Sequence, residues 1–406
     1  MTLEQQRHLV RDLARRYMEI ATSGETKAKE RRWRDTTSGR RPDRSPVWLN
    51  LNACRREVQP LEELQCEDPF LRSAEDRLCW SLACHDLGDD AVLSPEWSVG
   101  AAVQFEGEHL YGVPTPRIMP KDKGGAWAYS PAIRLETDLD KLRIPRWFHD
   151  EAATARRREQ AEELLGDIIP VRVTCDLHAS AHLDHIASNL IGMSELMLNL
   201  ALNPELVHRL MAFLRDFALS TMDQLEAMGL LTENNNAPKH FSDSIRKTPA
   251  GQPLKAQDMW LWTNSQNFQL VGPDQFREFL LEYQRPILER CGAVSYGCCE
   301  DLTLKVAQVL TLKNLRIFVN SAWTKLEVTA PKCAERGLCI EWRQLATDMM
   351  LTPDLDRIMK GLKRGLEITK GVNRCIVLQE VQSVEGDLPR FKEWVRRAIR
   401  LCEADV

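Results

Sequence analysis

Short apolar runs that alternate with longer helical segments constrain the fold of this chain more than any other feature. The runs with strand-like composition are 169–175, 258–262, 293–299, 315–321, 337–342 and 374–381. The segment 204–230 is typical of what separates them, with Pro204 in its first turn, apolar residues at helical spacing and Gly229 as a stop. Repeated strand and helix, without a long antiparallel alternation, indicate a parallel sheet covered by helices.

The way these strands pass into their helices narrows the fold class further. No strand leads into its helix through a G-x-G-x-x-G or P-loop turn, so the nucleotide-binding sheets are less favoured than a closed barrel. We therefore expect an α/β fold, a single (β/α)8 TIM barrel with an N-terminal helical extension. By length alone 406 residues also suit two or three domains, but one elaborated barrel is long enough.

Composition excludes several classes of protein. With 43% hydrophobic and 28% charged residues the chain reads as globular rather than as collagen, coiled coil or disordered. A formal charge of -5 gives no overall positive field, so neither nucleic acid nor an acidic membrane is expected as a partner. No apolar run approaches a membrane span and the N-terminus lacks the apolar core of a secretory signal, so we expect a cytoplasmic protein with its 12 cysteines reduced.

The basic charge is concentrated at the N-terminus. Residues 1–44 hold 12 Lys+Arg and 7 Asp+Glu, a net +5, so the remaining chain carries -10. We expect a helix over 3–22 and then a solvated segment up to the run PVWLNLN. This extension, 1–44, precedes a barrel domain, 45–406, and serves either as a flexible lead-in that covers the end of the barrel or as a docking surface for an anionic partner.

The end of the 293–299 run carries the strongest candidate site. In a barrel, the residues at the carboxyl ends of strands line the site. Side chains alternate along a strand, so Tyr296, Cys298 and Glu300 share one side and Cys299 takes the other, unless the strand has ended and a turn at Gly297 lets both thiols converge.

Two adjacent thiols suggest a metal site. Thiolates suit zinc, and a catalytic zinc needs three protein ligands and one open position. We expect Cys298, Cys299 and Glu380, which ends the last strand, to be these ligands. Glu300 is the rival oxygen ligand and otherwise a catalytic carboxylate. The alternative is that both cysteines are small buried hydrophobes on a core strand.

Three histidines follow the 169–175 run. His178, His182 and His185 have the spacing of one helix face, but no H-E-x-x-H motif is present. His178 lies nearest the strand end and could supply a metal ligand or a proton. His182 and His185 are expected to make polar contacts at a helix start.

Polar and aromatic residues at other strand ends complete the candidates. Tryptophans could form a wall around a flat or methylated substrate, but they are as easily core. Arg343 could hold a carboxylate or phosphate through its two-pronged donors, or form a structural ion pair. The substrate-binding candidates are Trp260, Trp262, Gln266, Tyr296, Trp323 and Arg343, and the catalytic candidates are His178, Asp243 and Glu300.

From about residue 169 to the C-terminus, nearly 60% of its length, the chain resembles the uroporphyrinogen decarboxylase superfamily, in particular its branch of corrinoid-dependent methyl transfer. The segments that carry the resemblance are IGMSELMLNLALNPELVHRLMAFLRDF, SQNFQLVGPDQFREFLLEYQRPIL, AVSYGCCEDL and LRIFVNSAW. The resemblance implies one (β/α)8 barrel with its site in the carboxyl-terminal mouth.

The resemblance also implies a zinc site with departures from the family pattern. In the zinc methyltransferases of this group a His-x-Cys pair on a middle strand and a cysteine after the last strand bind the metal. Here the pair reads Tyr296-Gly297-Cys298, so Cys298 matches the thiolate and the histidine is missing. Glu380 stands near the end of the last strand in place of a cysteine. Either a different set, Cys298, Cys299 and Glu380, binds zinc, or no zinc is bound.

The function implied is transfer of a methyl group between a small methylated substrate (an ether, amine or thiol) and a corrinoid protein or thiol acceptor. Zinc would be the cofactor, and the corrinoid would be carried by a partner protein docked over the barrel mouth. The runner-up is metal-independent decarboxylation of a porphyrinogen-like polycarboxylate, with Arg343 holding carboxylates and Asp243 stabilising the protonated intermediate. The third alternative is a non-catalytic binding barrel. A homodimer is one assembly we consider, because the sequence does not determine the oligomeric state.

Overall fold

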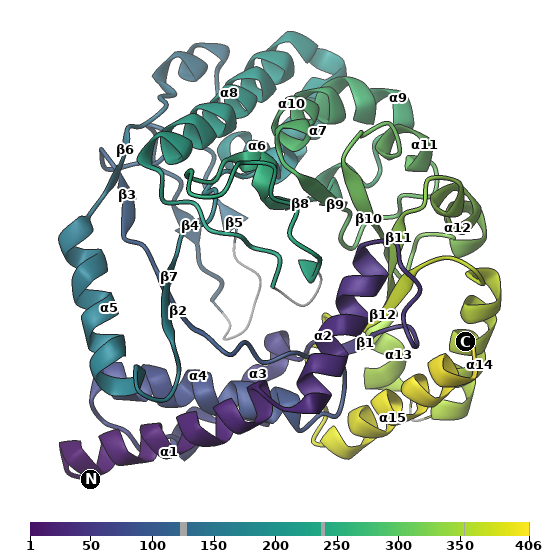
Figure 1. The fold of residues 1–406 in the computed structure, drawn as a ribbon. Coiled ribbons are helices and arrows are strands. Elements are labelled where there is room, and N and C mark those ends of the chain that lie inside the picture. Colours follow the sequence, from purple (N-terminus) through teal and green to yellow (C-terminus); the bar gives the residue numbers. More distant parts are fainter. Residues whose placement is uncertain (122–127, 237–239, 353, 406) are drawn as a thin grey trace.

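The chain folds into a mixed α/β structure around one six-stranded parallel sheet (Figure 1). The computed structural model describes residues 1–121, 128–236, 240–352 and 354–405. In this part of the chain the strand order of the sheet is β1-β12-β11-β10-β9-β8, and each neighbouring pair is parallel. The six strands are β1 (Val47–Leu49), β8 (Trp260–Thr263), β9 (Ala293–Tyr296), β10 (Leu315–Asn320), β11 (Cys339–Gln344) and β12 (Arg374–Leu378).

A second parallel pair and two antiparallel pairs account for the other described strands. β2 (Trp97–Gly100) pairs in parallel with β7 (Val171–Thr174). The segment between them contains two small antiparallel pairs, β3 (Val103–Phe105) with β6 (Trp147–His149) and β4 (Arg117–Ile118) with β5 (Ala128–Tyr129). The six apolar runs of the sequence are all strands, and the prediction of a parallel sheet is confirmed.

The strands of the main sheet are buried on both faces, as expected of a parallel sheet with helices packed around it. Every residue of β9 and of β12 is buried, and in β10 only Arg316 is exposed. Side chains from neighbouring strands meet in one small cluster, which contains Trp260, Ala293, Ile317, Val319 and Cys339. The sequence of these strands, mostly apolar, therefore matches their place in the core.

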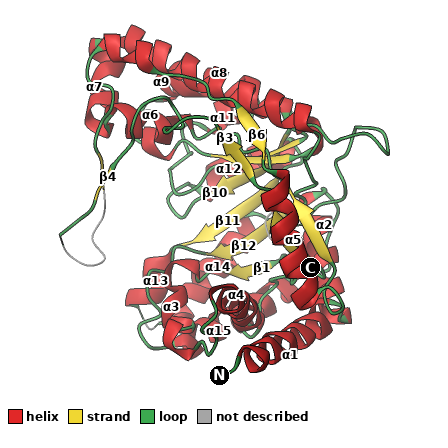
Figure 2. Cartoon of the chain, turned by 90° about the vertical axis from the view of Figure 1, so that its left-hand side faces the viewer, coloured by secondary structure: helices red, strands yellow, loops and turns green. Residues whose placement is uncertain are grey.

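The helices begin and end where the sequence signals lie. α8 (Pro204–Met228) has Asn203 as its N-cap, proline in its first turn and Gly229 in a left-handed conformation at its end. In the two views α7 and α8 lie at the opposite end of the molecule from α1 and α15 (Figure 2). The other helices are α1 (Leu3–Ala21), α2 (Gly24–Thr37), α3 (Arg55–Val58), α4 (Pro69–His85), α5 (Glu151–Leu165), α6 (Leu183–Ile191), α7 (Met193–Leu202), α9 (Pro273–Phe276), α10 (Glu282–Arg290), α11 (Val306–Val309), α12 (Leu326–Glu335), α13 (Ala346–Leu351), α14 (Leu355–Ile368) and α15 (Leu388–Ala404).

No helix among the described residues combines the length and the apolar composition that crossing a bilayer requires.

The basic N-terminal segment differs from the expectation. The stretch expected to be solvated is mostly helix α2, and its Trp33 is fully buried against Phe241, Cys375 and Val377. Arg32 forms an ion pair with the fully buried carboxylate of Asp90. Some charges of this segment are neutralised within it, as in Lys29–Glu25 and Arg32–Asp43, and others by distant groups such as Asp90, and α2 packs as part of the protein core.

Candidate functional site

The candidate site lies where three strands of the main sheet end. Because the strands are parallel, their carboxyl ends share one edge of the sheet. Cys298 and Cys299 follow β9, Arg343 is the second-last residue of β11, and Glu380 follows β12. The fold therefore brings together residues that lie about 80 positions apart in the sequence, as Cys299 and Glu380 do.

A sharp turn at Gly297 aims both thiols at the same space. Gly297 has φ of 117°, and a Cβ there would lie 2.9 Å from both Cβ and O of Val319. Only glycine combines this backbone conformation with so close an approach. The strand ends at Tyr296, so the alternation of sides stops and Cys298 and Cys299 converge, which is the second of the two arrangements considered from the sequence.

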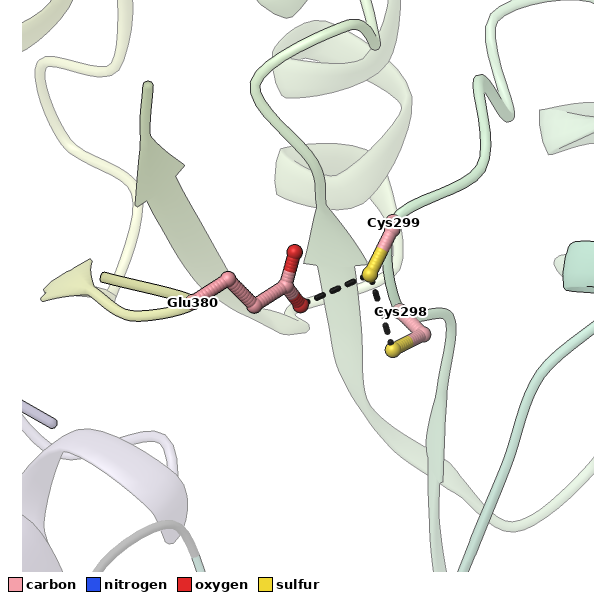
Figure 3. A group of neighbouring side chains, drawn as sticks. All are labelled: Cys298, Cys299 and Glu380. Carbon is pink, nitrogen blue, oxygen red and sulfur yellow. Dashed lines mark hydrogen bonds between the residues drawn. The ribbon is translucent and has the colours of Figure 1, made fainter. Parts of the chain in front are cut away.

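Cys298, Cys299 and Glu380 form one compact group (Figure 3). The two Sγ atoms are 3.3 Å apart, and the Cys299 thiol donates to Glu380 Oε1 at 2.7 Å. One ligand atom from each residue lies within 4.8 Å of the other two. Glu380 has φ of 65°, a left-handed conformation that is rare for residues other than glycine and that often marks functional positions.

Arg343 points its guanidinium at this group from β11. Its side chain is only 4% exposed, and its Nε donates to Glu341 Oε1 at 2.8 Å. Its Nη1 lies 3.4 Å from Cys298 Sγ and 3.3 Å from Glu380 Oε1, with Cys299 Sγ at 3.9 Å. One fixed positive charge therefore faces all three candidate ligand atoms.

The two thiols differ in acidity because of these contacts. The hydrogen bond from Cys299 and then the charge of Arg343 lower the pKa of Cys298 to about 7, despite its burial. The pKa of Cys299 is raised far above its usual value by its hydrogen bond to Cys298, by burial and by Glu380. Cys298 is thus the thiol of the pair that ionises first, while Cys299 keeps its proton and donates it in a hydrogen bond.

Glu300 holds the turn rather than joining the ligand group. Its carboxylate is fully buried and accepts from Ser265 N at 2.7 Å, from Ser265 Oγ at 3.1 Å and from Cys298 N at 2.9 Å. Both oxygens are satisfied by groups of two neighbouring loops. From the sequence we considered Glu300 as a metal ligand or a catalytic carboxylate. In this geometry its hydrogen bonds hold the turn that carries Cys298.

The aromatic candidates divide between the site and the core. Trp323 is 59% exposed and lines the same small cavity, of about 150 Å³, as Cys298, Cys299, Arg343 and Glu380. Trp262 lies beside the turn, where its Nε1 donates to Gly297 O at 2.8 Å.

The remaining substrate-binding candidates lie away from that cavity. Trp260 is buried among the strands, with its Nε1 on Ser242 Oγ, because its strand position faces the core. Tyr296 is fully buried and donates to Gln284 Oε1. Gln266 is half-buried in a short 3-10 turn, with its backbone N on Asn264 Oδ1.

The histidines do not share a helix face as the spacing predicted. His178 is exposed in the loop after β7, has φ of 48°, and its ring packs near Trp147. His182 is the N-cap of α6, so only His185 lies within the helix, where it hydrogen-bonds Asn264 Oδ1.

His182 and Asp243 complete the candidates. The ring of His182 packs against Trp262 with centroids 4.6 Å apart. Burial, followed by the charge of His185, lowers the pKa of His182 to about 4. Asp243 is exposed and pairs with Arg40 of the N-terminal segment, whose hydrogen bond lowers the pKa of that carboxyl. The structure thus leaves His178 and Asp243 outside the sulfur and carboxylate group.

Glu341 is a member of the site that the sequence analysis missed. It is fully buried and holds the Arg343 guanidinium in place. The available signal is the spacing Glu-x-Arg on β11, because residues two apart on a strand point to the same face.

The donor set fits a zinc ion after a small expansion. Zinc takes sulfur and carboxylate ligands, and three protein ligands with an open position are typical of catalytic sites. A tetrahedral zinc with Zn–S bonds of about 2.3 Å separates two sulfurs by about 3.8 Å, so this pair, at 3.3 Å, would open by about 0.5 Å. Side-chain rotation at two half-buried cysteines on a turn allows such a movement.

Comparison with known proteins leaves the geometry as the basis for assigning a function. No protein-family model matches the chain, and no curated protein matches it.

Proposed function

We propose that the protein is a zinc-dependent methyltransferase that moves a methyl group between a small methylated substrate and a corrinoid protein or a thiol. The observation that carries the proposal is the convergence of Cys298, Cys299 and Glu380 within 4.8 Å at the carboxyl ends of parallel strands. This edge of a parallel sheet is where α/β enzymes place their sites.

The residues have separate tasks in this proposal. Cys298, Cys299 and Glu380 would hold zinc and leave its fourth position to the substrate. Bound zinc would polarise the heteroatom that carries the methyl group, or hold a substrate thiol as thiolate. Trp323 in the cavity wall would contact the substrate.

Arg343 would offset part of the charge of the loaded site. Two thiolates and one carboxylate carry three negative charges; a divalent ion would cancel two of them, and Arg343, which also pairs with Glu341, would offset part of the third. The contacts of Arg343 Nη1 with Cys298 and Glu380 support this role, because they place the positive charge where the ligands meet. A positive charge beside the ligands lowers the cost of gathering negative charge in a half-buried cavity.

The proposal includes a closed (β/α)8 barrel in the cytoplasm, with the site in its mouth. The six strands of the main sheet pair in parallel and β2 pairs in parallel with β7, so the two sheets together supply the eight strands that such a barrel needs. On the β1 side, Asp90 N donates to Val47 O and Leu49 N donates to Asp89 Oδ2, in the segment that leads to β2.

On the opposite side, the segment 232–234 hydrogen-bonds both to the end of β7 and to the start of β8. Thr232 N donates to Cys175 O, and Trp260 N donates to Asn234 Oδ1. On both sides a connecting segment, rather than a neighbouring strand, makes these contacts, which is compatible with closure of the sheet. The corrinoid would be carried by a separate protein that reaches the mouth of this barrel.

Metal analysis of the purified full-length chain tests the proposal. We expect about one zinc per chain, and less than a tenth of that in Cys298→Ala with its circular dichroism unchanged. Cys79→Ser, which changes another half-buried cysteine outside the site, should keep its zinc. A zinc-loaded protein should then demethylate a member of a panel of methyl ethers, amines and thioethers with cob(I)alamin or a thiol as acceptor. A metal-free protein that decarboxylates a polycarboxylate would replace this proposal with the runner-up.

A further inference from the structure

The two sulfurs of the site are close enough to react with each other. Cys298 and Cys299 are consecutive, and their Sγ atoms lie 3.3 Å apart (Figure 3). A disulfide bond is about 2.05 Å long, so the sulfurs would move together by about 1.3 Å from that separation. The turn at Gly297 ends the strand before them, so this movement breaks no ladder hydrogen bond of β9.

The same sulfurs are open to a small reagent. Both are half-buried and line the cavity of about 150 Å³ beside Trp323. Cys79 and Cys84 are half-buried as well, and the other eight cysteines are buried. A peroxide molecule therefore has a route to the Cys298 and Cys299 sulfurs that most of the thiols do not share.

The neighbours of the pair suit an oxidation in two steps. Arg343 Nη1 lies 3.4 Å from Cys298 Sγ, where it stabilises negative charge on that sulfur. Glu380 Oε1 accepts from the Cys299 thiol at 2.7 Å, so it offers a path for the proton of that thiol once Cys298 has been oxidised and no longer carries negative charge. One sulfur is thus prepared as nucleophile and the other as resolving thiol.

We propose that hydrogen peroxide converts Cys298 and Cys299 into a reversible vicinal disulfide. The Cys298 thiolate attacks one peroxide oxygen, the O–O bond breaks, and hydroxide leaves and takes a proton from solvent. The Cys299 sulfur then attacks the Cys298 sulfenic acid, the S–O bond breaks, and the departing hydroxide leaves as water with the proton that Glu380 took from Cys299. In total, two thiols and one hydrogen peroxide give one disulfide and two waters.

The disulfide would act as a switch rather than as a structural bridge. Consecutive Cα atoms are about 3.8 Å apart, closer than in ordinary disulfides, and strained disulfides are easily reduced. Oxidation also removes both thiolate ligands of the site. This consequence for the metal rests on the proposed function, whereas formation of the disulfide does not.

The test follows the oxidation state of the full-length protein. Reduced protein, after removal of metal with a chelator, is treated with one equivalent of hydrogen peroxide and blocked with iodoacetamide. Peptide mapping should find Cys298 and Cys299 without the iodoacetamide modification and linked by a disulfide bond, and dithiothreitol should restore both thiols. Cys79→Ser should behave as the wild type does, whereas Cys298→Ser and Cys299→Ser should form no such bond. A wild-type protein that keeps both thiols, or that carries Cys298 to a sulfinic acid without a disulfide, would overturn the inference whatever the variants do.

Added zinc separates this inference from the proposed function. With zinc at about 100 times its dissociation constant only about 1% of the chains have free ligands, so disulfide formation should slow about 100-fold. If the disulfide forms at an unchanged rate, the inference stands and the zinc assignment fails. If zinc binds but the metal-free protein forms no disulfide, the zinc assignment stands and the inference fails.

Discussion

Replacing Gly297 by alanine should destabilise the protein and disturb the site at once. Gly297 sits between β9 and the two cysteines with φ of 117°, a conformation that L-residues rarely adopt. A methyl group there would lie 2.9 Å from Val319 Cβ, 2.9 Å from Val319 O and 3.0 Å from Leu302 Cδ1. Val319 belongs to β10, near its carboxyl end, and is fully buried, so it cannot move aside without shifting the sheet.

Two costs add in this variant. Holding alanine in a left-handed conformation costs about 1–2 kcal/mol, and forcing an extra methyl into a packed core costs about 1–3 kcal/mol. We therefore expect Gly297→Ala to lower the free energy of unfolding by about 2–5 kcal/mol. Gly107 has φ of 105° with no atom within 4 Å of the position its Cβ would take, so Gly107→Ala should show only the first cost.

Equilibrium urea unfolding followed by circular dichroism measures both variants. The difference between Gly297→Ala and Gly107→Ala should be about 1–3 kcal/mol, the overpacking part alone. Equal free energies of unfolding, within about 0.5 kcal/mol, would refute the argument that the turn is held by close contact with β10. The zinc content of Gly297→Ala should also fall, because the sulfurs no longer converge.

Three further perturbations have clear expected outcomes. Asp90→Asn should destabilise by about 3–5 kcal/mol in urea unfolding, because it removes the buried carboxylate that pairs with both Arg32 and Arg44. Trp323→Ala should leave the free energy of unfolding within about 0.5 kcal/mol of wild type, since its side chain is 59% exposed, while the KM for the methylated substrate rises. His182 has a folded pKa near 4, below its unfolded value of 6.5, so it takes up a proton on unfolding between these values. Its contribution to stability is therefore complete above pH 6.5 and is lost as the pH falls toward 4, and His182→Gln should lose less stability than wild type over that range in urea titrations.

Much of the fold follows from local sequence patterns. The apolar runs became strands because a parallel sheet buries both faces, so that most positions of β9, β10 and β12 are apolar. α8 began at its proline and ended at Gly229 because both signals are local backbone chemistry. Such patterns can be interpreted without knowing which helices and strands pack against one another.

The N-terminal segment shows where local patterns fail. Its charges read as solvated because some of their partners are distant in sequence: Arg32 meets Asp90, and Arg34 donates to Ser242 O. Trp33 is buried because Phe241 and Val377 lie over it. A run of like charges shows that counter-charges are needed but not where they are.

The candidate site, too, could be predicted from the sequence only in part. Cys298, Cys299 and Glu380 could be brought together from sequence because parallel strand ends share an edge. The sequence did not predict where two side chains point. Trp260 faces the core because of the face of the sheet that it takes. The Arg343 guanidinium is held toward the site by its buried partner Glu341.

X-ray absorption at the zinc edge of the zinc-loaded protein tests the central claim most directly. The account predicts two sulfur neighbours at about 2.3 Å and light neighbours at about 2.0–2.2 Å, with one sulfur neighbour in Cys298→Ser, whose weakened site is loaded with excess zinc. A spectrum with only nitrogen and oxygen neighbours, or one that is unchanged in Cys298→Ser, would contradict it.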